Sequence, residues 1–242
     1  MIRLLFFAVG AALALPLASA GERIESFDSQ IVVERTGDLV VTETIRVRAE
    51  GNKIKRGIFR DIPLLQKTKL GFRIKKPLEI ISVTRDGSEE DYRTESIGEG
   101  GIRMYIGRES FFLEPGSYTY EVKYRTGRQL YLEKDRDALY WNVNGTGSGF
   151  PTDKVTATVH LPSGIKGTKV GGFTGKLGEQ GKDYKATLTK TGATITATRP
   201  FRAGENLTVV LEWPPGQLDA AASRIRKPLP QDDPRAAEGR AR

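Results

Sequence analysis

The segment SYTYEVKYR, residues 117–125, alternates between two kinds of side chain without a break. Tyr118, Tyr120, Val122 and Tyr124 are aromatic or aliphatic, and the residues between them are polar or charged. Successive side chains of a β-strand point to opposite faces of a sheet, so this pattern predicts a strand with one buried and one solvated face. Such strands are typical of antiparallel sheets. The segment KVTATVHL, residues 154–161, repeats the pattern.

The same period of two recurs along most of the chain. It predicts further strands at residues 27–34, 39–48, 78–85, 102–106, 138–143, 184–189, 193–198 and 206–213, with Gly, Pro and Asp turns between them. No amphipathic helix of convincing length interrupts these strands. We therefore predict an all-β fold, an antiparallel β-sandwich that is immunoglobulin-like or similar. It is either one sandwich or two packed β subdomains that divide near residues 149–153. The glycine-rich segment 162–181 is predicted as a loop or a weak hairpin at an edge.

The two ends of the chain differ from this middle part. Residues 1–20 carry one positive charge, an apolar run and the small-residue ending Ala18-Ser19-Ala20, which predicts a signal peptide and a mature N-terminus at Gly21. Residues 21–216 form the predicted sandwich domain, and residues 217–242 a polar disordered tail. No later segment approaches the roughly 18–20 apolar residues that cross a bilayer. We expect an exported protein, periplasmic or extracellular, either free or membrane-associated.

Composition excludes several kinds of chemistry. The chain has no cysteine, so disulfides, thiolate catalysis and zinc–thiolate sites are ruled out. The acidic run 133–137 contains a lysine and an arginine and lacks the calcium-loop pattern, so we predict a solvated turn before the next strand there. We predict no metal and no cofactor. The net charge of +8 allows weak attraction to anionic surfaces, but no basic cluster is interleaved with aromatic residues as nucleic-acid binding requires.

Nucleophilic catalysis has little support. The only histidine is His160, which the strand pattern places on a solvated face. The sequence Gly147-Ser148-Gly149 lacks the strand–turn–helix setting of a nucleophile elbow. We therefore predict no catalytic residue.

The segment RGIFRDIP, residues 56–63, is the densest functional signature in the chain. Alternation along residues 39–48 places Glu43 on the apolar face of its strand, where an unpaired carboxylate costs several kcal/mol. We expect Arg60, or failing that Arg56, to form a bidentate pair with Glu43. Phe59 and Ile62 would then plug the end of the sandwich, and Pro63 would end the strand.

This segment has three interpretations. The preferred one is a structural joint, meaning a linking segment whose charges pair within the protein, formed by Glu43, Arg60, Arg56, Asp61 and Pro63. A ligand-binding role comes second. An acid pair of Glu43 and Asp61 for general acid–base catalysis comes last, because two carboxylates of unknown separation are a weak signal among 30 acidic residues.

A second candidate site lies at Tyr140, Trp141 and Asn144. Alternation sends the two rings to opposite faces, so one ring is core and the other could lie exposed beside Asn144 and bind a sugar. The preferred alternative is that both rings are covered, because aromatic residues commonly fill the core of a sandwich.

Five phrases together resemble a known family. They are VVTETIRV (40–47), RGIFRDIP (56–63), ALYWNVNG (138–145), VHLP (159–162) and FRAGENLTVVLEWPPG (201–216). In this order they resemble the extracytoplasmic domain of the DUF2207 family of predicted membrane proteins, whose function is unknown. The resemblance implies an exported all-β domain that is normally followed by transmembrane helices. The polar segment 217–242 departs from that pattern.

Two classes of function remain open from the sequence. The first is a non-enzymatic module at the cell envelope that binds a protein or polymer through loops or a free strand edge. The second is a hydrolase that uses acidic residues on an envelope glycan or polymer. The first is preferred because the usual catalytic constellations are missing.

Overall fold

The computed structural model describes residues 21–67, 73–98, 100–145 and 148–219. Every regular element within these residues is a β-strand, so the predicted all-β fold is confirmed. Each of the ten strands that alternation predicts corresponds to an observed strand. The predicted signal peptide (residues 1–20) lies outside the described residues, as does the predicted tail from residue 220 onward.

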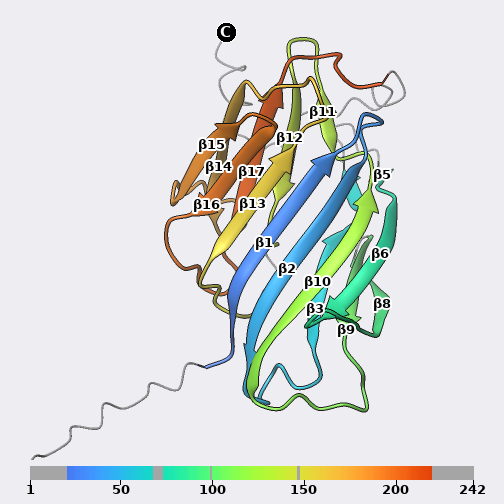
Figure 1. Cartoon of the computed structure of the whole chain (residues 1–242), viewed down its shortest axis with the longest axis vertical. Coiled ribbons are helices and arrows are strands. Elements are labelled where there is room, and N and C mark those ends of the chain that lie inside the picture. The colour runs from blue at the N-terminus through green and yellow to red at the C-terminus, as the bar shows by residue number, and fades with distance from the viewer. Residues whose placement is uncertain (1–20, 68–72, 99, 146–147, 220–242) are drawn as a thin grey trace, which may run out of the picture.

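The largest sheet has eight strands and forms one layer of the sandwich (Figure 1). Its order is β15 (Tyr184–Thr189), β16 (Gly192–Ala197), β13 (Val155–His160), β1 (Arg23–Val33), β2 (Leu39–Ala49), β10 (Gly116–Thr126), β6 (Leu78–Arg85) and β7 (Ser88–Glu89). All neighbours are antiparallel except β1 and β13, which are parallel with Phe27 opposite Val155. The predicted antiparallel sandwich thus includes one parallel pair, whose strands β1 and β13 are joined by a long stretch of chain and not by a hairpin.

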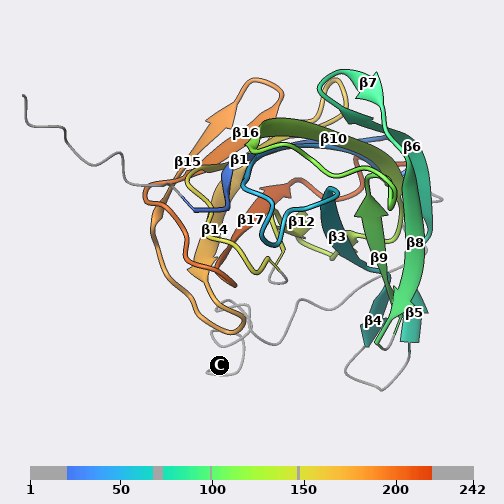
Figure 2. The ribbon, with the colours of Figure 1, turned by 90° about the horizontal axis from the view of Figure 1, so that it is seen from below.

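Two smaller sheets lie on the same side of this layer (Figure 2). The four-stranded sheet has the order β11 (Leu130–Leu132), β12 (Asp137–Asn142), β17 (Asn206–Trp213) and β14 (Lys169–Gly175). The three-stranded sheet has the order β3 (Ile58–Pro63), β9 (Gly101–Ile106) and β8 (Tyr92–Ile97). A short hairpin of β4 (Leu65–Lys67) and β5 (Arg73–Lys75) extends from the same region. The second layer of the sandwich is therefore divided between two sheets.

The core lies between the layers and follows the alternation of the central strands. Along β2 the buried residues are Leu39, Val41, Glu43, Ile45, Val47 and Ala49. Tyr120, Val122 and Tyr124 of β10 are buried as well. β17 is buried at every position. The alternation of side chains along β2 and β10 thus determines which face of each of these two strands meets the other layer.

The segment RGIFRDIP contains β3, the edge strand of the three-stranded sheet, which ends at Pro63. Alternation within β3 turns Phe59 outward, where it is 41% exposed, and turns Ile62 into the core. The expectation that Phe59 plugs the sandwich is therefore wrong. The physical reason is that the segment is a regular strand, so its neighbouring residues face opposite ways.

The glycine-rich segment 162–181 contains β14, which lies at the edge of the four-stranded sheet, so of the two alternatives predicted for this segment the structure favours the weak hairpin at an edge over the loop. β14 pairs with β17 along its whole length. A Cβ atom at Gly172 would lie 2.1 Å from the carbonyl oxygen of Thr208, so glycine permits the close approach of the two strands. Near the predicted subdomain boundary, Thr152 forms bridges to Ile24 and Phe201. β1 and β13, on either side of this boundary in the sequence, are adjacent in one sheet.

Candidate functional site

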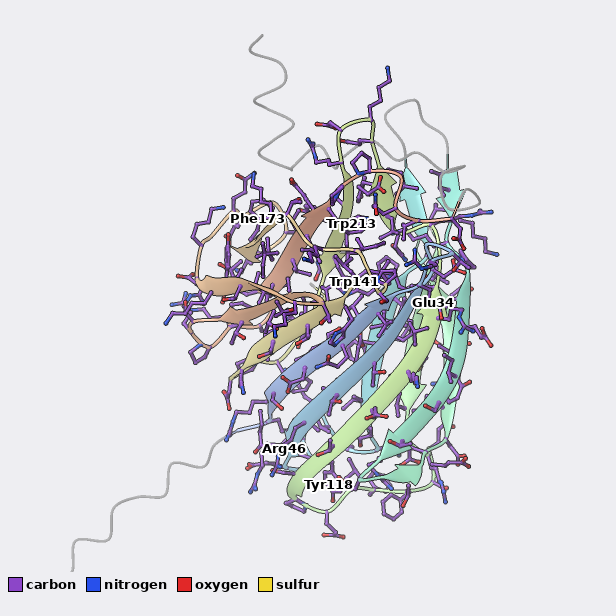
Figure 3. All side chains as sticks on the ribbon, turned by 45° about the horizontal axis from the view of Figure 1, so that its top comes forward. Glu34, Arg46, Tyr118, Trp141, Phe173 and Trp213 are labelled. Carbon is purple, nitrogen blue, oxygen red and sulfur yellow. The ribbon has the colours of Figure 1, made fainter. Side chains whose placement is uncertain are left out.

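A cavity of about 1080 Å³ lies between the eight-stranded sheet and the two smaller sheets. β1 and β2 contribute Ile24, Phe27, Ile45 and Val47 to one wall. β3 contributes every residue from Ile58 to Pro63, and β12 contributes Tyr140, Trp141 and Asn142. Trp141 lies in the interior near the middle of the molecule (Figure 3). The cavity is thus placed where the second layer is divided.

The cavity is elongated along the strands. Its lining extends from Val47, near one end of β2, to Thr126, near the end of β10. Thr126 is paired with Leu39 at the other end of β2. At about 3.3 Å per residue, the part of β2 from Leu39 to Val47 spans roughly 26 Å. The cavity therefore has room for a long, narrow ligand.

A buried ion pair lies between the layers beside this cavity. Glu43 is fully buried, and its two carboxylate oxygens accept hydrogen bonds from Nε of Arg60 at 2.7 Å and from Nη2 of Arg60 at 2.8 Å. The hydroxyl of Tyr124 donates a third bond to the same carboxylate at 2.8 Å. Arg60 also donates to the carbonyl oxygens of Val143 and Asn144. The expected bidentate pair between Glu43 and Arg60 is therefore present.

Burial and charge act against each other in this cluster. Burial alone would lower the pKa of Arg60, but attraction and hydrogen bonding from Glu43 outweigh it and raise that pKa. The pKa of the Tyr124 hydroxyl is raised well above its usual value, first by burial and then by the charge of Glu43. Arg60 therefore stays charged and Tyr124 stays neutral. The cluster has no net charge and its members are hydrogen-bonded.

The other residues of the predicted joint lie apart from Glu43. Asp61 accepts two hydrogen bonds from Arg103, its cross-strand neighbour on β9, at 2.7 and 2.8 Å. The guanidinium of Arg56 is exposed and lies 4.3 Å from the ring centre of Phe112. The structure therefore brings Glu43 and Arg60 together, gives Asp61 its own arginine and leaves Arg56 at the surface.

The second candidate group is divided between two environments. Trp141 is buried and lines the cavity, and its indole nitrogen has no hydrogen-bond acceptor among the described residues. Tyr140 is half-buried on the opposite face of β12, with its ring against those of Tyr131 and Phe173. Asn144 is buried and bonds to the backbone of Glu205 and Leu207. Asn144 therefore connects two segments of the protein.

Lys76 is a candidate that sequence reasoning missed. It lies between β5 and β6, is partly buried and lines the cavity. Burial lowers the pKa of its ammonium group to about 8. Within the described part of the chain, no carboxylate forms an ion pair with Lys76. The sequence Lys75-Lys76-Pro77 looks like an ordinary solvated approach to a strand, so nothing local indicated that one of the two lysines is buried.

The remaining sequence candidates have structural roles. Asp137 is buried at the start of β12, where it accepts a bond from the backbone of Gly216, and burial raises the pKa of its carboxyl group. The expectation of a fully solvated acidic turn is therefore wrong at Asp137. His160 lies on the partly exposed face of β13, with its Nε2 atom 3.2 Å from the side-chain oxygen of Gln30. Ser148 bonds locally to Phe150. Among the described residues, no group of three or more acidic or histidine side chains could hold a metal ion.

These features define an all-β sandwich domain with a ligand-sized cavity between its layers. The model of the family described as "Predicted membrane protein (DUF2207) N-terminal domain" matches residues 23–213, and the chain belongs to this family. The resemblance drawn from the five sequence phrases is thereby confirmed. In the residues that the structure describes, we find no helix long and apolar enough to cross a membrane.

A curated relative and several solved structures show further similarity. The uncharacterized protein YciQ of Escherichia coli strain K12 is 29% identical over 207 residues, which cover 86% of this chain and 32% of the relative. The chain thus spans about a third of that relative. Leukotriene A4 hydrolase from Saccharomyces cerevisiae is similar over 79% of this chain and 29% of its own, at 12% identity and a TM-score of 0.47. The M1 zinc metallopeptidase from Deinococcus radiodurans is similar over 78% and 42%, at 15% identity and a TM-score of 0.42. Structural likeness at this level carries no functional conclusion.

Proposed function

We propose that this domain is a non-enzymatic binding module on the extracytoplasmic side of the cell envelope, and that it holds its ligand in the cavity between its layers. The observation that carries the proposal is a large cavity beside which both candidate carboxylates, Glu43 and Asp61, are already paired with arginines. Membership of a family of predicted membrane proteins supports the location. The sequence alone suggested binding through loops or a free strand edge, and we propose the cavity as the binding site instead.

The size of the cavity supports a ligand. Small-molecule sites usually enclose about 300–1,000 Å³ and are lined by apolar and aromatic side chains with a few polar groups. The cavity of about 1080 Å³ has this composition, with Phe27, Ile45 and Trp141 among its apolar residues and Arg60 and Gln129 among its polar ones. Protein interiors are otherwise closely packed, and unfilled space in a core costs stability. A ligand in this cavity would make apolar contacts with its lining.

The pairing of the carboxylates disfavours the alternative, an acid-residue hydrolase. Hydrolysis by paired carboxyl groups requires one of them to release or accept a proton and the other to attack or activate water. Asp61, a lining residue whose side chain lies on the same face of β3 as the outward-facing Phe59, is held by two charge-assisted bonds from Arg103. Glu43 is held in the same way by Arg60. Two carboxylates fixed by bidentate pairs support binding and structure better than proton transfer.

The proposal is tested by partly filling the cavity. Ile58 lines it from β3, so we expect Ile58→Trp to reduce binding of the uncharged, apolar fluorescent probe N-phenyl-1-naphthylamine at least tenfold in the full exported chain. Ile81→Trp on β6 is the matched control, because Ile81 is exposed and lies outside the cavity lining. Circular dichroism reports whether each variant is folded, and Ile58→Phe replaces Ile58→Trp if the larger ring prevents folding. Unchanged probe binding by a folded Ile58 variant would overturn the proposal, as would the absence of probe binding by the unsubstituted chain.

A further inference from the structure

We propose that the ligand of this cavity is an unbranched acyl chain with a carboxylate head group, and that the head group binds at Lys76 while the chain lies along β1 and β2. This inference rests on the proposed function and makes it specific. It follows from the shape of the cavity, from the hydrogen bonds of its polar groups and from the position of the one partly buried charge that has no counter-charge among the described lining residues.

The shape favours a long chain with few polar atoms. The lining runs roughly 26 Å along the strands, and the wall formed by β1 and β2 presents Ile24, Phe27, Ile45 and Val47. A peptide or glycan of that length would bring many hydrogen-bonding groups into this apolar space, and each one left unpaired would cost free energy. An acyl chain carries none along its length. Its burial is favourable for every methylene group that leaves water.

Most polar side chains along the cavity already have partners within the protein; Trp141, whose indole nitrogen has no acceptor among the described residues, is an exception. Arg60 is bound to Glu43 and Asp61 to Arg103. Gln129 donates to the hydroxyl of Thr126, and Asn142 accepts from the backbone of Gly145. These groups satisfy one another and leave little for a polar ligand to replace. The binding energy of a ligand would therefore come from apolar contact and from one charge.

That charge belongs to Lys76. Arg60 and Asp61 are neutralised by their own partners, whereas the ammonium group of Lys76 is partly buried with no carboxylate paired to it. Lys53 is the other lysine of the lining, but it is exposed, and an exposed lysine needs no counter-charge. A single uncompensated positive charge is complementary to a single negative one. A carboxylate fits this better than a phosphate monoester, which carries close to two negative charges at neutral pH.

The protonation state of Lys76 agrees with this assignment. Burial lowers the pKa of Lys76 to about 8, so the side chain is mostly protonated near neutral pH and can receive an anion. The other ionisable groups of the lining are Lys53, Arg60, Asp61, Tyr124, Tyr131 and Tyr140. Of these, Arg60 and Asp61 are held in ion pairs. Loss of the Lys76 proton above pH 8 should therefore weaken binding of an anion and leave binding of an uncharged chain unaffected.

The test compares three ligands that share one chain: tetradecanoate, tetradecanol and tetradecyl phosphate. Their affinities for the full exported chain are measured by displacement of the apolar probe. We expect tetradecanoate to bind ten- to a hundred-fold more tightly than tetradecanol, the range for one charge-assisted bond in a buried site. Lys76→Met should remove this preference with tetradecanol binding unchanged, and Lys76→Arg should retain it. Lys53→Met should retain the preference. Lys75→Met, the same kind of substitution at the exposed lysine beside Lys76 and outside the lining, is the matched control and should have no effect.

The outcomes separate this inference from the proposed function. Equal binding of tetradecanoate and tetradecanol would overturn the head-group assignment and leave the binding cavity in place. Loss of the preference in Lys53→Met instead of Lys76→Met would overturn the orientation of the chain. Tighter binding of tetradecyl phosphate than of tetradecanoate would overturn the assignment of a carboxylate head group. Absence of binding by all three ligands, with the apolar probe still bound in the cavity, would reject the acyl chain altogether.

Discussion

Breaking the pair between Glu43 and Arg60 should destabilise the domain more than any surface substitution. Glu43→Ala would leave the guanidinium of Arg60 and the hydroxyl of Tyr124 without their carboxylate in the interior. Removing one partner of a buried ion pair typically costs about 3–5 kcal/mol, because the other charge stays buried and uncompensated. We expect a loss in this range from Glu43→Ala and a similar loss from Arg60→Ala.

The double variant tests the physical cause. When both charged groups are replaced by apolar residues of similar size, as in Glu43→Leu with Arg60→Met, the cost of burying charge disappears together with the attraction. We therefore expect the double variant to be far more stable than the sum of the single losses implies. The single variants Glu43→Leu and Arg60→Met complete the cycle, and we expect a coupling free energy near the upper end of the range of about 0.5–3 kcal/mol measured for residues in direct contact.

The measurement is urea-induced unfolding followed by tryptophan fluorescence, with the free energy of unfolding taken from the linear dependence on denaturant. The control lies on the same strand. Arg46 pairs with Glu25 at 2.8 Å, a distance close to that of the buried pair, but Arg46 is exposed on the outer face of β2 (Figure 3). Exposed pairs contribute about 0.2–1 kcal/mol, so Arg46→Ala should cost no more than that.

Two results would refute the reasoning. If Glu43→Ala lost no more stability than Arg46→Ala, the buried carboxylate would not be holding a buried charge. If the losses from the two single substitutions added up in the double variant, the two residues would act independently and the bidentate geometry would carry no energetic weight.

Three further predictions follow from other buried or constrained groups. Lys76→Met should stabilise the empty domain near pH 7 by up to about 3 kcal/mol, because the folded state lowers the pKa of this lysine from 10.5 to about 8. Between pH 8 and pH 10.5 the unfolded chain still holds the proton that Lys76 has lost in the folded state. Unfolding by urea should therefore show the stability of the unsubstituted domain rising with pH across this window, and Lys76→Met should lack this rise. Gly57→Ala should cost at least about 2 kcal/mol, because Gly57 has φ +143° and its Cβ would lie 1.8 Å from the carbonyl oxygen of Ile106; Gly51→Ala, at φ +73° with open space around it, should cost about 1–2 kcal/mol in the same assay. Asp137→Asn should raise the melting temperature near neutral pH, because burial raises the pKa of this carboxyl group and its charged form opposes folding; the difference should vanish in melts at acidic pH, where Asp137 is itself neutral.

The alternation of single strands was sufficient to predict the ion pair. Residues 39–48 place Glu43 on the buried face by parity alone, and Arg60 follows on the next strand. The same rule gives the orientation of Phe59 when the segment RGIFRDIP is treated as a strand and not as a joint. Its period of two then directs Ile58, Arg60 and Ile62 to one face and Phe59 to the other.

The cavity could not be predicted in this way. Its walls come from β1, β2 and β3, which follow one another in the sequence, and from β12, which lies far from them, and these strands enclose a cavity only where the second layer divides. The burial of Lys76 depends on that arrangement and not on the residues beside it. For the segment that contains β14, the sequence left a loop and a weak hairpin open, because the glycines that allow its close approach to β17 carry no alternating pattern.

The parallel pairing of β1 with β13 has a consequence for how quickly the domain forms. β1 gains one neighbour at once through the hairpin to β2, but its other neighbour begins only at Val155. Closing so long a loop before any contact rewards it is slow, and domains dominated by such distant pairings fold in milliseconds to seconds. During that interval the edge of β1 that β13 will cover stays open to other strands. The first strand of the domain is therefore where a newly made chain most needs protection until residues 155–160 arrive.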